Sequence, residues 1–209
     1  MYSVKEIFKT LQGEGAHTGR AAVFCRFSGC NLWSGVESDR AGAGCRICDT
    51  DFVGVDGGGG GRFDEPQALV TAILAAWGEG REHRFVVFTG GEPLLQLDDR
   101  LIGACHAHGF KVAIETNGTR TPPPGVDWVC VSPKLAASWA HREGDELKLL
   151  HPHPELDPAD LAALPFRHFW LQPTDGPARE LNTAATVAYC LAHPGWRLSL
   201  QTHKLIGMP

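Results

Sequence analysis

Short apolar runs alternate with amphipathic segments along this chain, and few architectures accommodate such an order. Runs rich in β-branched or aromatic residues, each about the length of one strand, lie at 21–28, 84–89, 110–116, 127–132, 146–150, 167–172 and 197–201. Segments with apolar residues at helical spacing lie at 65–78, 94–109 and 181–195. Strands that alternate with helices predict an α/β fold with a mainly parallel sheet.

Two of the connections between these strands are poorly suited to ordinary helices. The connection at 119–126 contains three consecutive prolines, and residues 132–145 are barely enough for a helix. The helical layer is therefore expected to be thin. Five consecutive glycines within 54–64 predict a flexible loop rather than a domain linker, because neither side could fold alone. We expect one domain over residues 1–209.

The charge balance excludes several classes of partner. The chain carries 24 acidic and 19 basic residues and has no run of lysine or arginine. Proteins that bind a phosphate backbone or an anionic membrane usually have such a run. The first residues lack the apolar stretch of a secretion signal, and no apolar run reaches the roughly 18 residues of a membrane span. We therefore expect a cytoplasmic protein that binds neither nucleic acid nor membranes.

The seven cysteines fall into two groups. Their odd number and uneven placement argue against a disulfide framework, so we expect reduced thiols. Four of them lie inside apolar segments, where a free cysteine behaves as a small hydrophobic residue; these are Cys25, Cys105, Cys130 and Cys190. The other three lie in a loop-like stretch and need another explanation; these are Cys30, Cys45 and Cys48.

Unusual polar segments directly follow five of the predicted strands. They are SGC, TGGEP, ETNG, SPK and QPTD, after the first, second, third, fourth and sixth strands. Glycine, proline, asparagine and serine often do no more than mark turns. Charged and amide side chains that recur at the same place on successive strands favour a second interpretation, in which these segments form the ligand-binding rim of a parallel sheet.

Two kinds of metal site would use three loop cysteines. A structural zinc ion needs a fourth ligand, for which His17 or Cys25 is available but without convincing spacing. A 4Fe-4S cluster with one iron left open needs only Cys30, Cys45 and Cys48. The Cys-x2-Cys spacing with a distant third cysteine leaves both possibilities open.

Gly90-Gly91-Glu92-Pro93 after a strand, downstream of a three-cysteine loop, resembles the radical S-adenosylmethionine (SAM) superfamily. Within it the chain is similar to the 7-carboxy-7-deazaguanine synthase family over nearly its whole length, through FKTLQGEGAHTG, CRFSGCNLW, CRICDTDF, TGGEPLLQ, ETNGT, VSPK and LQTHKL. The superfamily usually has Cys-x3-Cys-x2-Cys, whereas this chain has Cys-x14-Cys-x2-Cys. The longer loop adds little closure entropy, because that entropy grows only logarithmically with length.

The resemblance implies a trimmed partial (β/α) barrel of the radical SAM type. It also implies a lyase that converts 6-carboxy-5,6,7,8-tetrahydropterin to 7-carboxy-7-deazaguanine with release of ammonia, in queuosine and 7-deazapurine biosynthesis. The implied cofactors are a 4Fe-4S cluster, SAM and Mg2+. The implied partners are the small pterin substrate, a reductant such as flavodoxin or ferredoxin, and a second copy of the chain in a homodimer.

The same resemblance implies a role for each matching residue. The cluster ligands are Cys30, Cys45 and Cys48, and Thr50 would bind magnesium, which prefers oxygen ligands. SAM would be contacted by Ile47, Cys48, Asp49, Gly91, Glu92, Asn117, Ser132, Pro133, Lys134, Gln172, Pro173, Thr174 and Asp175. The pterin would be contacted by Leu11, Gln12, Gly13, Glu14, Arg26, Thr89, Glu115, His203 and Pro209. No side chain is expected to act as a catalytic acid or base, because the radical is generated on cluster-bound SAM.

Plainer interpretations of these residues remain open from the sequence. Arg26 suits a bidentate contact with the substrate carboxylate but equally a structural ion pair, and Lys134 could be a surface lysine. QGEG lacks the Gly-Lys-Ser/Thr ending of a P-loop, so it does not predict a phosphate site. Two rival functions are a radical SAM activase that acts on a protein and a zinc-stabilised binding module without catalysis.

Overall fold

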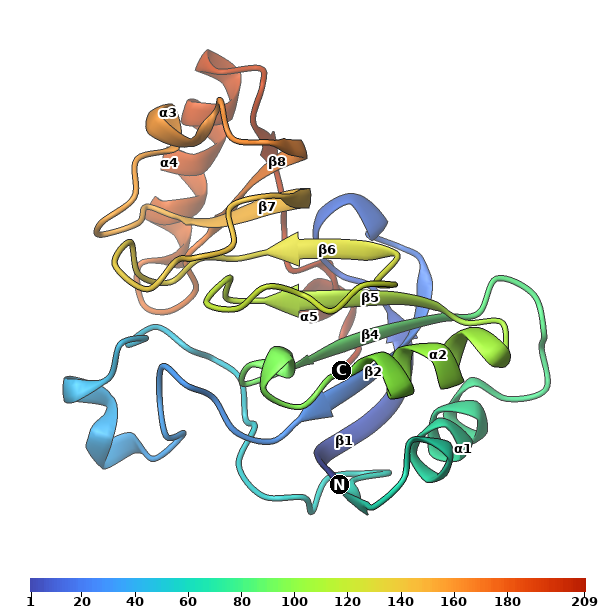
Figure 1. The fold of residues 1–209 in the computed structure, drawn as a ribbon. Helices are drawn as coiled ribbons and strands as arrows, with labels where there is room; N and C mark the ends of the chain where they lie inside the picture. The colour runs from blue at the N-terminus through green and yellow to red at the C-terminus, as the bar shows by residue number, and fades with distance from the viewer.

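A computed structural model describes residues 1–209, and all its strands join one nine-stranded sheet in the order β3-β1-β2-β4-β5-β6-β7-β8-β9 (Figure 1). The strands are β1 (Tyr2–Leu11), β2 (Ala21–Phe27), β3 (Gly61–Phe63), β4 (Phe85–Gly90), β5 (Lys111–Thr116), β6 (Trp128–Val131), β7 (Gly144–His151), β8 (Phe166–Pro173) and β9 (Arg197–Leu198). Neighbouring strands from β2 to β9 are parallel, and β1 is antiparallel to both β2 and β3. The predicted α/β fold with a mainly parallel sheet is confirmed.

The helices are few and short, as expected for a thin helical layer. They are α1 (Pro66–Trp77), α2 (Asp99–Ala107), α3 (Pro158–Leu161), α4 (Arg179–Ala192) and α5 (Thr202–Ile206), with 3-10 turns η1 (Gly15–His17), η2 (Glu37–Gly42) and η3 (Pro93–Leu95). Neither doubtful connection, 119–126 or 132–145, contains a helix. None of the helices has the length and apolar content that a membrane crossing requires.

Two strands, β1 and β3, were not expected from the sequence. In β1 the buried residues Tyr2 and Val4 are two apart, but the next buried apolar residue is Ile7, three further on. A register shift between Val4 and Glu6 in the pairing with β2 causes this break. A bulge of this kind interrupts the two-residue alternation by which a half-buried strand is recognised.

The glycine run does not form the flexible loop that its composition predicts. Gly57 N donates to Lys5 O (2.9 Å) and Ile7 N donates to Gly58 O (2.8 Å), so the run lies along β1 and continues into β3. A Cβ atom on Gly60 would lie 2.2 Å from the carbonyl oxygen of Lys5. A Cβ atom would also come within 3 Å of β1 at Gly57 and Gly59, so these three glycines are required for close backbone packing rather than for mobility.

The two main hydrophobic cores lie on the same face of the sheet. One packs α1 and α2 against β1, β2, β4 and β5, and the other packs α3 and α4 against β6, β7 and β8 (Figure 1). Cys25 and Cys105 belong to the first core, as predicted. Cys130 is buried on the opposite face of the sheet, as predicted for a core residue. Cys190 packs against the second core but is only partly buried, so the prediction that it is a buried core residue is only partly correct.

Candidate active site

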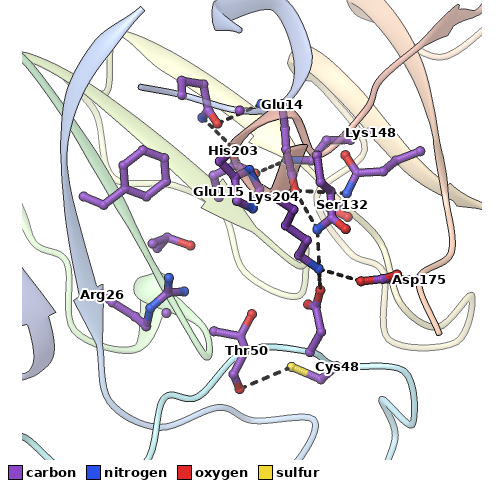
Figure 2. Close-up of a pocket in the computed structure, with 18 of the residues that line it drawn as sticks. Glu14, Arg26, Cys48, Thr50, Glu115, Ser132, Lys148, Asp175, His203 and Lys204 are labelled. Atoms are coloured by element: carbon purple, nitrogen blue, oxygen red, sulfur yellow. Dashed lines mark hydrogen bonds and ion pairs between the residues drawn. The ribbon is translucent and has the colours of Figure 1, made fainter. Parts of the chain in front are cut away.

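The face of the sheet opposite the two main cores carries a cavity of about 350 Å³. Its walls come from the strand ends, the cysteine loop and the last residues of the chain, which Figure 2 shows converging on one space. All predicted site residues line this cavity except Cys30, Cys45, Glu92 and Pro133. Four of the five polar segments that follow the strands, TGGEP, ETNG, SPK and QPTD, therefore line one cavity, whereas SGC lies beside it, where Cys30 packs against Gly91.

Strand alternation explains which side chains face the cavity. Arg26 pairs with Thr89 across β2 and β4, and both line the cavity, whereas the preceding pair, Cys25 and Phe88, is buried in the core beneath the helices. Glu115 on β5 also points to the cavity side, two residues from Ala113. Because successive residues of a strand point to opposite faces, apolar and functional residues alternate along the same strands.

A buried group of ionised side chains forms one end of the cavity. Lys148 Nζ on β7 lies 2.6 Å from Glu14 Oε2 and 2.5 Å from Glu115 Oε2. Glu115 Oε1 also accepts from Gln12 Nε2 (3.0 Å), and Glu14 Oε1 accepts from Gln172 Nε2 (3.1 Å). The three charged side chains are 5%, 16% and 17% exposed in the order Lys148, Glu14, Glu115, so water screens their interactions weakly.

The shared lysine affects its two carboxylates differently. Burial acts to raise the pKa of Glu14, but the charge and hydrogen bonds of Lys148, with a hydrogen bond from Gln201, outweigh it and lower that pKa to about 2. For Glu115, burial together with the charges of Glu14 and Glu146 outweighs Lys148, so its pKa is raised. The single ammonium of Lys148 lies near three carboxylates, those of Glu14, Glu115 and Glu146. This end of the cavity is therefore short of positive charge and rich in hydrogen-bond acceptors.

Aromatic and cationic side chains line another wall of the cavity. Phe8 and Phe24 stack with their ring centroids 5.7 Å apart and their planes 13° apart. Beside them Arg26 Nε donates to Glu6 Oε1 (2.7 Å). The ion pair that the sequence left as an alternative for Arg26 is therefore present, and Arg26 also lines the cavity.

The C-terminal segment packs closely against the QGEG segment. Thr202 N donates to Gly13 O (2.9 Å), and a Cβ atom on Gly13 would lie 2.1 Å from His203 Nδ1. Gly13 is therefore needed for the approach of the His203 imidazole. Pro209 also lines the cavity, where its carbonyl oxygen accepts from Thr10 Oγ1 (3.1 Å).

The glycine-rich segment after β4 packs directly against the first cysteine. Gly90 has a φ of +136°, and a Cβ atom on Gly91 would lie 2.1 Å from Gly29 O and 2.7 Å from the Cys30 Cβ. Side chains larger than hydrogen do not fit at either position. Glu92 is fully buried behind the cavity wall, where its carboxylate accepts from Thr116 Oγ1 (2.7 Å) and Asn117 N (2.8 Å). It braces the β4 and β5 ends, and its side chain does not reach the cavity.

The three loop cysteines lie near one another beside the cavity. The Cys45 and Cys48 thiols are hydrogen-bonded, and this bond lowers the pKa of Cys48 to about 6. Burial raises the pKa of Cys30, whose thiol also interacts electrostatically with Cys48. No three His, Cys, Asp or Glu side chains converge closely enough to hold a single ion. In a cluster each cysteine binds a different iron, so the thiols need not converge on one point.

The fourth ligands considered for a zinc site are both committed elsewhere. His17 packs against Phe85 and Trp128, at ring-centroid distances of 5.0 and 4.3 Å. Cys25 is buried in the core with Cys105. The donor set near the loop is therefore three thiols without a fourth, which fits an iron-sulfur cluster with an open iron better than a structural zinc ion.

Residues after the third cysteine face the mouth of the cavity. Thr50 takes part in a hydrogen bond through its main-chain carbonyl, which accepts from Cys48 Sγ (3.9 Å), so its hydroxyl remains available to a ligand (Figure 2). Asp49 and Asp175 are joined by Lys204 of α5, whose Nζ lies 2.8 and 2.7 Å from their carboxylates. This bridge, drawn in Figure 2, links the cysteine loop to the end of β8.

The residues predicted to contact SAM occupy two regions. Lys134 Nζ donates to Ser132 Oγ (2.7 Å) and lines the cavity rather than the outer surface. The Gln172 amide lies instead beside Glu14 and also accepts from Ser199 Oγ (3.1 Å). Its side chain therefore belongs with the residues predicted for the pterin.

Lys148, Gln201 and Lys204 also line the cavity, although none of them was predicted from the sequence. Lys148 is the inward residue in the middle of ELKLL, and a lysine flanked by leucines in a predicted buried strand was the available signal. Gln201 and Lys204 lie in the family-like segment LQTHKL, which was the available signal for them. Their partners are 152 to 187 residues away along the chain for Gln201 and 29 to 155 residues away for Lys204, so the contacts themselves could not be predicted.

Comparison with known proteins gives close full-length relatives. Proteins named 7-carboxy-7-deazaguanine synthase from Bordetella pertussis and Caulobacter vibrioides are 65% and 61% identical over 208 residues, which cover 100% of this chain and 99% of each relative. The crystal structure of QueE from Escherichia coli matches with a TM-score of 0.66 and 25% identity, covering 95% of this chain and 93% of that one. No protein-family model matches the chain.

Proposed function

The chain belongs to the 7-carboxy-7-deazaguanine synthase family, and from this premise we propose how its own residues carry out the reaction. The protein is a radical SAM enzyme with 7-carboxy-7-deazaguanine synthase activity, in queuosine biosynthesis. The proposed reaction is the conversion of 6-carboxy-5,6,7,8-tetrahydropterin to 7-carboxy-7-deazaguanine with release of ammonia. The observation that carries the proposal is the buried Glu14–Lys148–Glu115 group in a cavity with a stacked aromatic wall.

The two ends of the cavity suit the two ends of a carboxypterin. Figure 2 draws Glu14 and Glu115 at one end, and Arg26 with Thr50 at the other. We propose that the pterin's aminopyrimidinone edge, which is rich in N–H donors, faces Glu14 and Glu115. Its carboxylate would then face the Arg26 guanidinium, which forms strong bonds with carboxylates. The Phe8–Phe24 wall would contact the flat part of the ring.

A second set of residues would hold the cofactors. Cys30, Cys45 and Cys48 would hold a 4Fe-4S cluster, and Gly91 would approach the SAM amino group, since no side chain fits there. When bound, this cluster and SAM together supply a carbon radical that abstracts a hydrogen atom from the substrate. The Thr50 hydroxyl would bind Mg2+, which takes oxygen ligands. The other proposed SAM contacts that line the cavity are Ile47, Cys48, Asp49, Asn117, Ser132, Lys134, Pro173, Thr174 and Asp175.

The protein's own contribution is to hold the substrate and to exclude competing donors. Glu14 is ionised throughout the neutral range because Lys148 lowers its pKa to about 2, so it accepts N–H bonds without changing its protonation state. The bridge from Lys204 to Asp49 and Asp175 holds α5, and with it His203, over the cavity. Fixed orientation and restricted access are what a reaction through reactive radicals requires of its protein.

The partners follow from the family and remain proposals. The small-molecule substrate agrees with the size and polarity of the cavity. A small redox protein such as flavodoxin or ferredoxin would supply the electron. A homodimer is also proposed from the family.

One experiment separates the synthase from its rivals. The chain is purified without oxygen, its iron, sulfide and zinc are quantified, and SAM, reductant and carboxytetrahydropterin are added. Iron with sulfide, SAM cleavage and the deazaguanine product are expected. Zinc without iron would refute the radical SAM proposal, and SAM cleavage with an unchanged pterin would favour an activase.

Two variants test the proposed pterin site in the same assay. Glu115→Gln should keep its cluster and cleave SAM with reductant, but turn over the pterin much more slowly. Glu65→Gln is the matched control, because Glu65 lies on the surface in an exposed pair with Arg100, far from the cavity lining. Equal turnover by Glu115→Gln and the wild type would remove Glu115 from the pterin site.

A further inference from the structure

The enlarged interval between the first two cysteines folds around its own small core. Trp33 is 8% exposed, and its ring meets Phe52 edge-on at 5.6 Å, while its Nε1 donates to Val36 O (3.1 Å). Gly35 has a φ of +84°, and a Cβ atom there would lie 2.3 Å from the Val53 side chain. The interval therefore packs against the residues that follow the third cysteine.

Arg40, in the 3-10 turn η2, joins this small core to the second and third cysteines. Its guanidinium lies 4.0 Å above the Trp33 ring, and its Nε donates to both carboxylate oxygens of Glu37 at 2.8 Å. Its Nη1 donates to the main-chain carbonyls of Arg46 and Cys48, each at 3.1 Å. One side chain thus contacts the turn between Cys45 and Cys48 at two points.

Apart from the Lys204–Asp49 ion pair and the hydrogen bond between the Cys45 and Cys48 thiols, that turn has little other support. Residues 45–50 form neither helix nor strand. Upstream, the amides of Gly44 and Cys45 both donate to Leu32 O, at 2.9 and 3.3 Å, which fixes only the start of the turn. The Arg46 and Cys48 carbonyls, which point to Arg40, have no partner in regular secondary structure.

We propose that Arg40 is a positioning residue that clamps the Cys45–Cys48 turn into the form that receives the iron-sulfur cluster. This inference rests on the proposed function, which assigns the cluster to these cysteines. It also gives the enlarged interval a role, because Arg40 and Trp33 both lie within the fourteen residues that separate Cys30 from Cys45. The rigid guanidinium holds Glu37 through Nε while Nη1 donates to both carbonyls, and a lysine ammonium on its flexible stem does not reproduce this arrangement.

Three variants of the full-length chain test the clamp. Arg40→Met removes the donors, and Arg40→Lys keeps the charge but not the fork. Arg46→Met is the matched control, because Arg46 lies in the same loop with an exposed side chain that makes no hydrogen bond or ion pair. Thermal unfolding of each variant checks that the rest of the fold is unchanged.

Two measurements separate a clamp from a general structural role. In the cluster-free chain, amide exchange of residues 45–50 should be about tenfold faster in Arg40→Met than in the wild type, since two bonds to a charged donor are lost. After reconstitution, loss of iron to a chelator should also be about tenfold faster, and the spectrum of the reduced cluster should broaden. Arg40→Lys should show part of both effects, and Arg46→Met neither.

Each outcome decides the matter. Wild-type exchange and wild-type iron retention in Arg40→Met would overturn the clamp. An equally fast loss of iron from Arg46→Met would also overturn the clamp, because the charge of the loop rather than the geometry of Arg40 would then be responsible. Full iron retention by Arg40→Lys would overturn it for the same reason. A wild-type chain that takes up no iron would instead refute the proposed function, while the exchange measurement would still judge Arg40.

Discussion

Replacement of Lys148 by methionine should destabilise the protein by an amount that depends strongly on pH. Methionine keeps most of the length of the lysine side chain but removes the ammonium that lies 2.6 Å from Glu14 and 2.5 Å from Glu115. Both carboxylates are more than four-fifths buried. The variant therefore leaves two neighbouring buried carboxylates without a cation, the situation in which a broken ion pair is most costly.

The magnitude follows from the pKa of Glu14. Lys148 and its neighbours hold that pKa at about 2, against an ordinary value of 4.5. At about 1.36 kcal/mol for each pKa unit, the stabilisation of ionised Glu14 is on the order of 3 kcal/mol. This agrees with the range of about 3–5 kcal/mol for removing one member of a buried pair. We expect a loss of about 3 kcal/mol in the free energy of unfolding at neutral pH.

The pH dependence distinguishes this electrostatic cause from a packing defect. A carboxylate whose pKa is lowered by folding stabilises the folded state above its unfolded pKa, and this contribution is lost as the pH falls toward the folded pKa. For Glu14 that window runs from about 4.5 down to about 2. The variant lacks the contribution at every pH. Its difference from the wild type should therefore be largest at neutral pH and shrink below pH 4.5.

Urea unfolding of the cluster-free chain at pH 7.5 and at pH 3, within the window between the two pKa values, measures both quantities. Lys9→Met is the matched control, because Lys9 lies exposed on β1, where its Nζ donates to Trp77 O (2.6 Å) and lies over the Trp77 ring. It should cost less than about 1 kcal/mol, independent of pH. Adding Glu14→Gln to Lys148→Met should recover part of the loss. A Lys148→Met difference below 1 kcal/mol, or one that is equal at both pH values, would refute the reasoning.

Three further predictions concern the rest of the site. Gly13→Ala should displace His203, because the new Cβ would lie 2.1 Å from its Nδ1, and should raise the KM for the pterin several-fold or more while SAM cleavage continues; an unchanged KM would contradict this. Cys45→Ala should abolish cluster binding while Cys105→Ala, in the core, spares it, as iron analysis would reveal; loss of iron in both would contradict the assignment. Thr50→Ala should weaken the response to Mg2+ without lowering the melting temperature, since its hydroxyl supports no contact within the protein, and an unchanged magnesium titration would exclude Thr50 from the site.

Much of the fold was predictable because it depends on local pattern. Every apolar run identified in the sequence forms a strand, and four of the five polar segments after those strands line one cavity, as the common direction of parallel strands requires. The strand β1 escaped detection because its bulge breaks the alternation of buried residues. The glycine run was misjudged for a related reason, since composition alone does not indicate that β1 lies close enough to exclude a Cβ atom at Gly57, Gly59 and Gly60.

The site was predictable in its membership but less so in its connections. The resemblance supplied Glu14 and Glu115 separately, but nothing in the sequence indicated that one buried lysine joins them. Glu92 and Gln172 show the same limit. Their family positions were matched, yet the structure uses the first side chain to brace β4 and β5, and the second to hold Glu14.

The sequence by itself determined the α/β class, the three thiols in a loop, and the strand ends at which ligand-binding residues would gather. These properties arise from side-chain periodicity and from the direction of successive strands, which act over a few residues. Only the tertiary structure decided that Lys148 meets Glu14, 134 residues away, and that Lys204 meets Asp49, 155 residues away. Contacts at such separations depend on how the whole sheet and its last helix pack, and charge is stabilised inside a protein only by the neighbours that this packing provides.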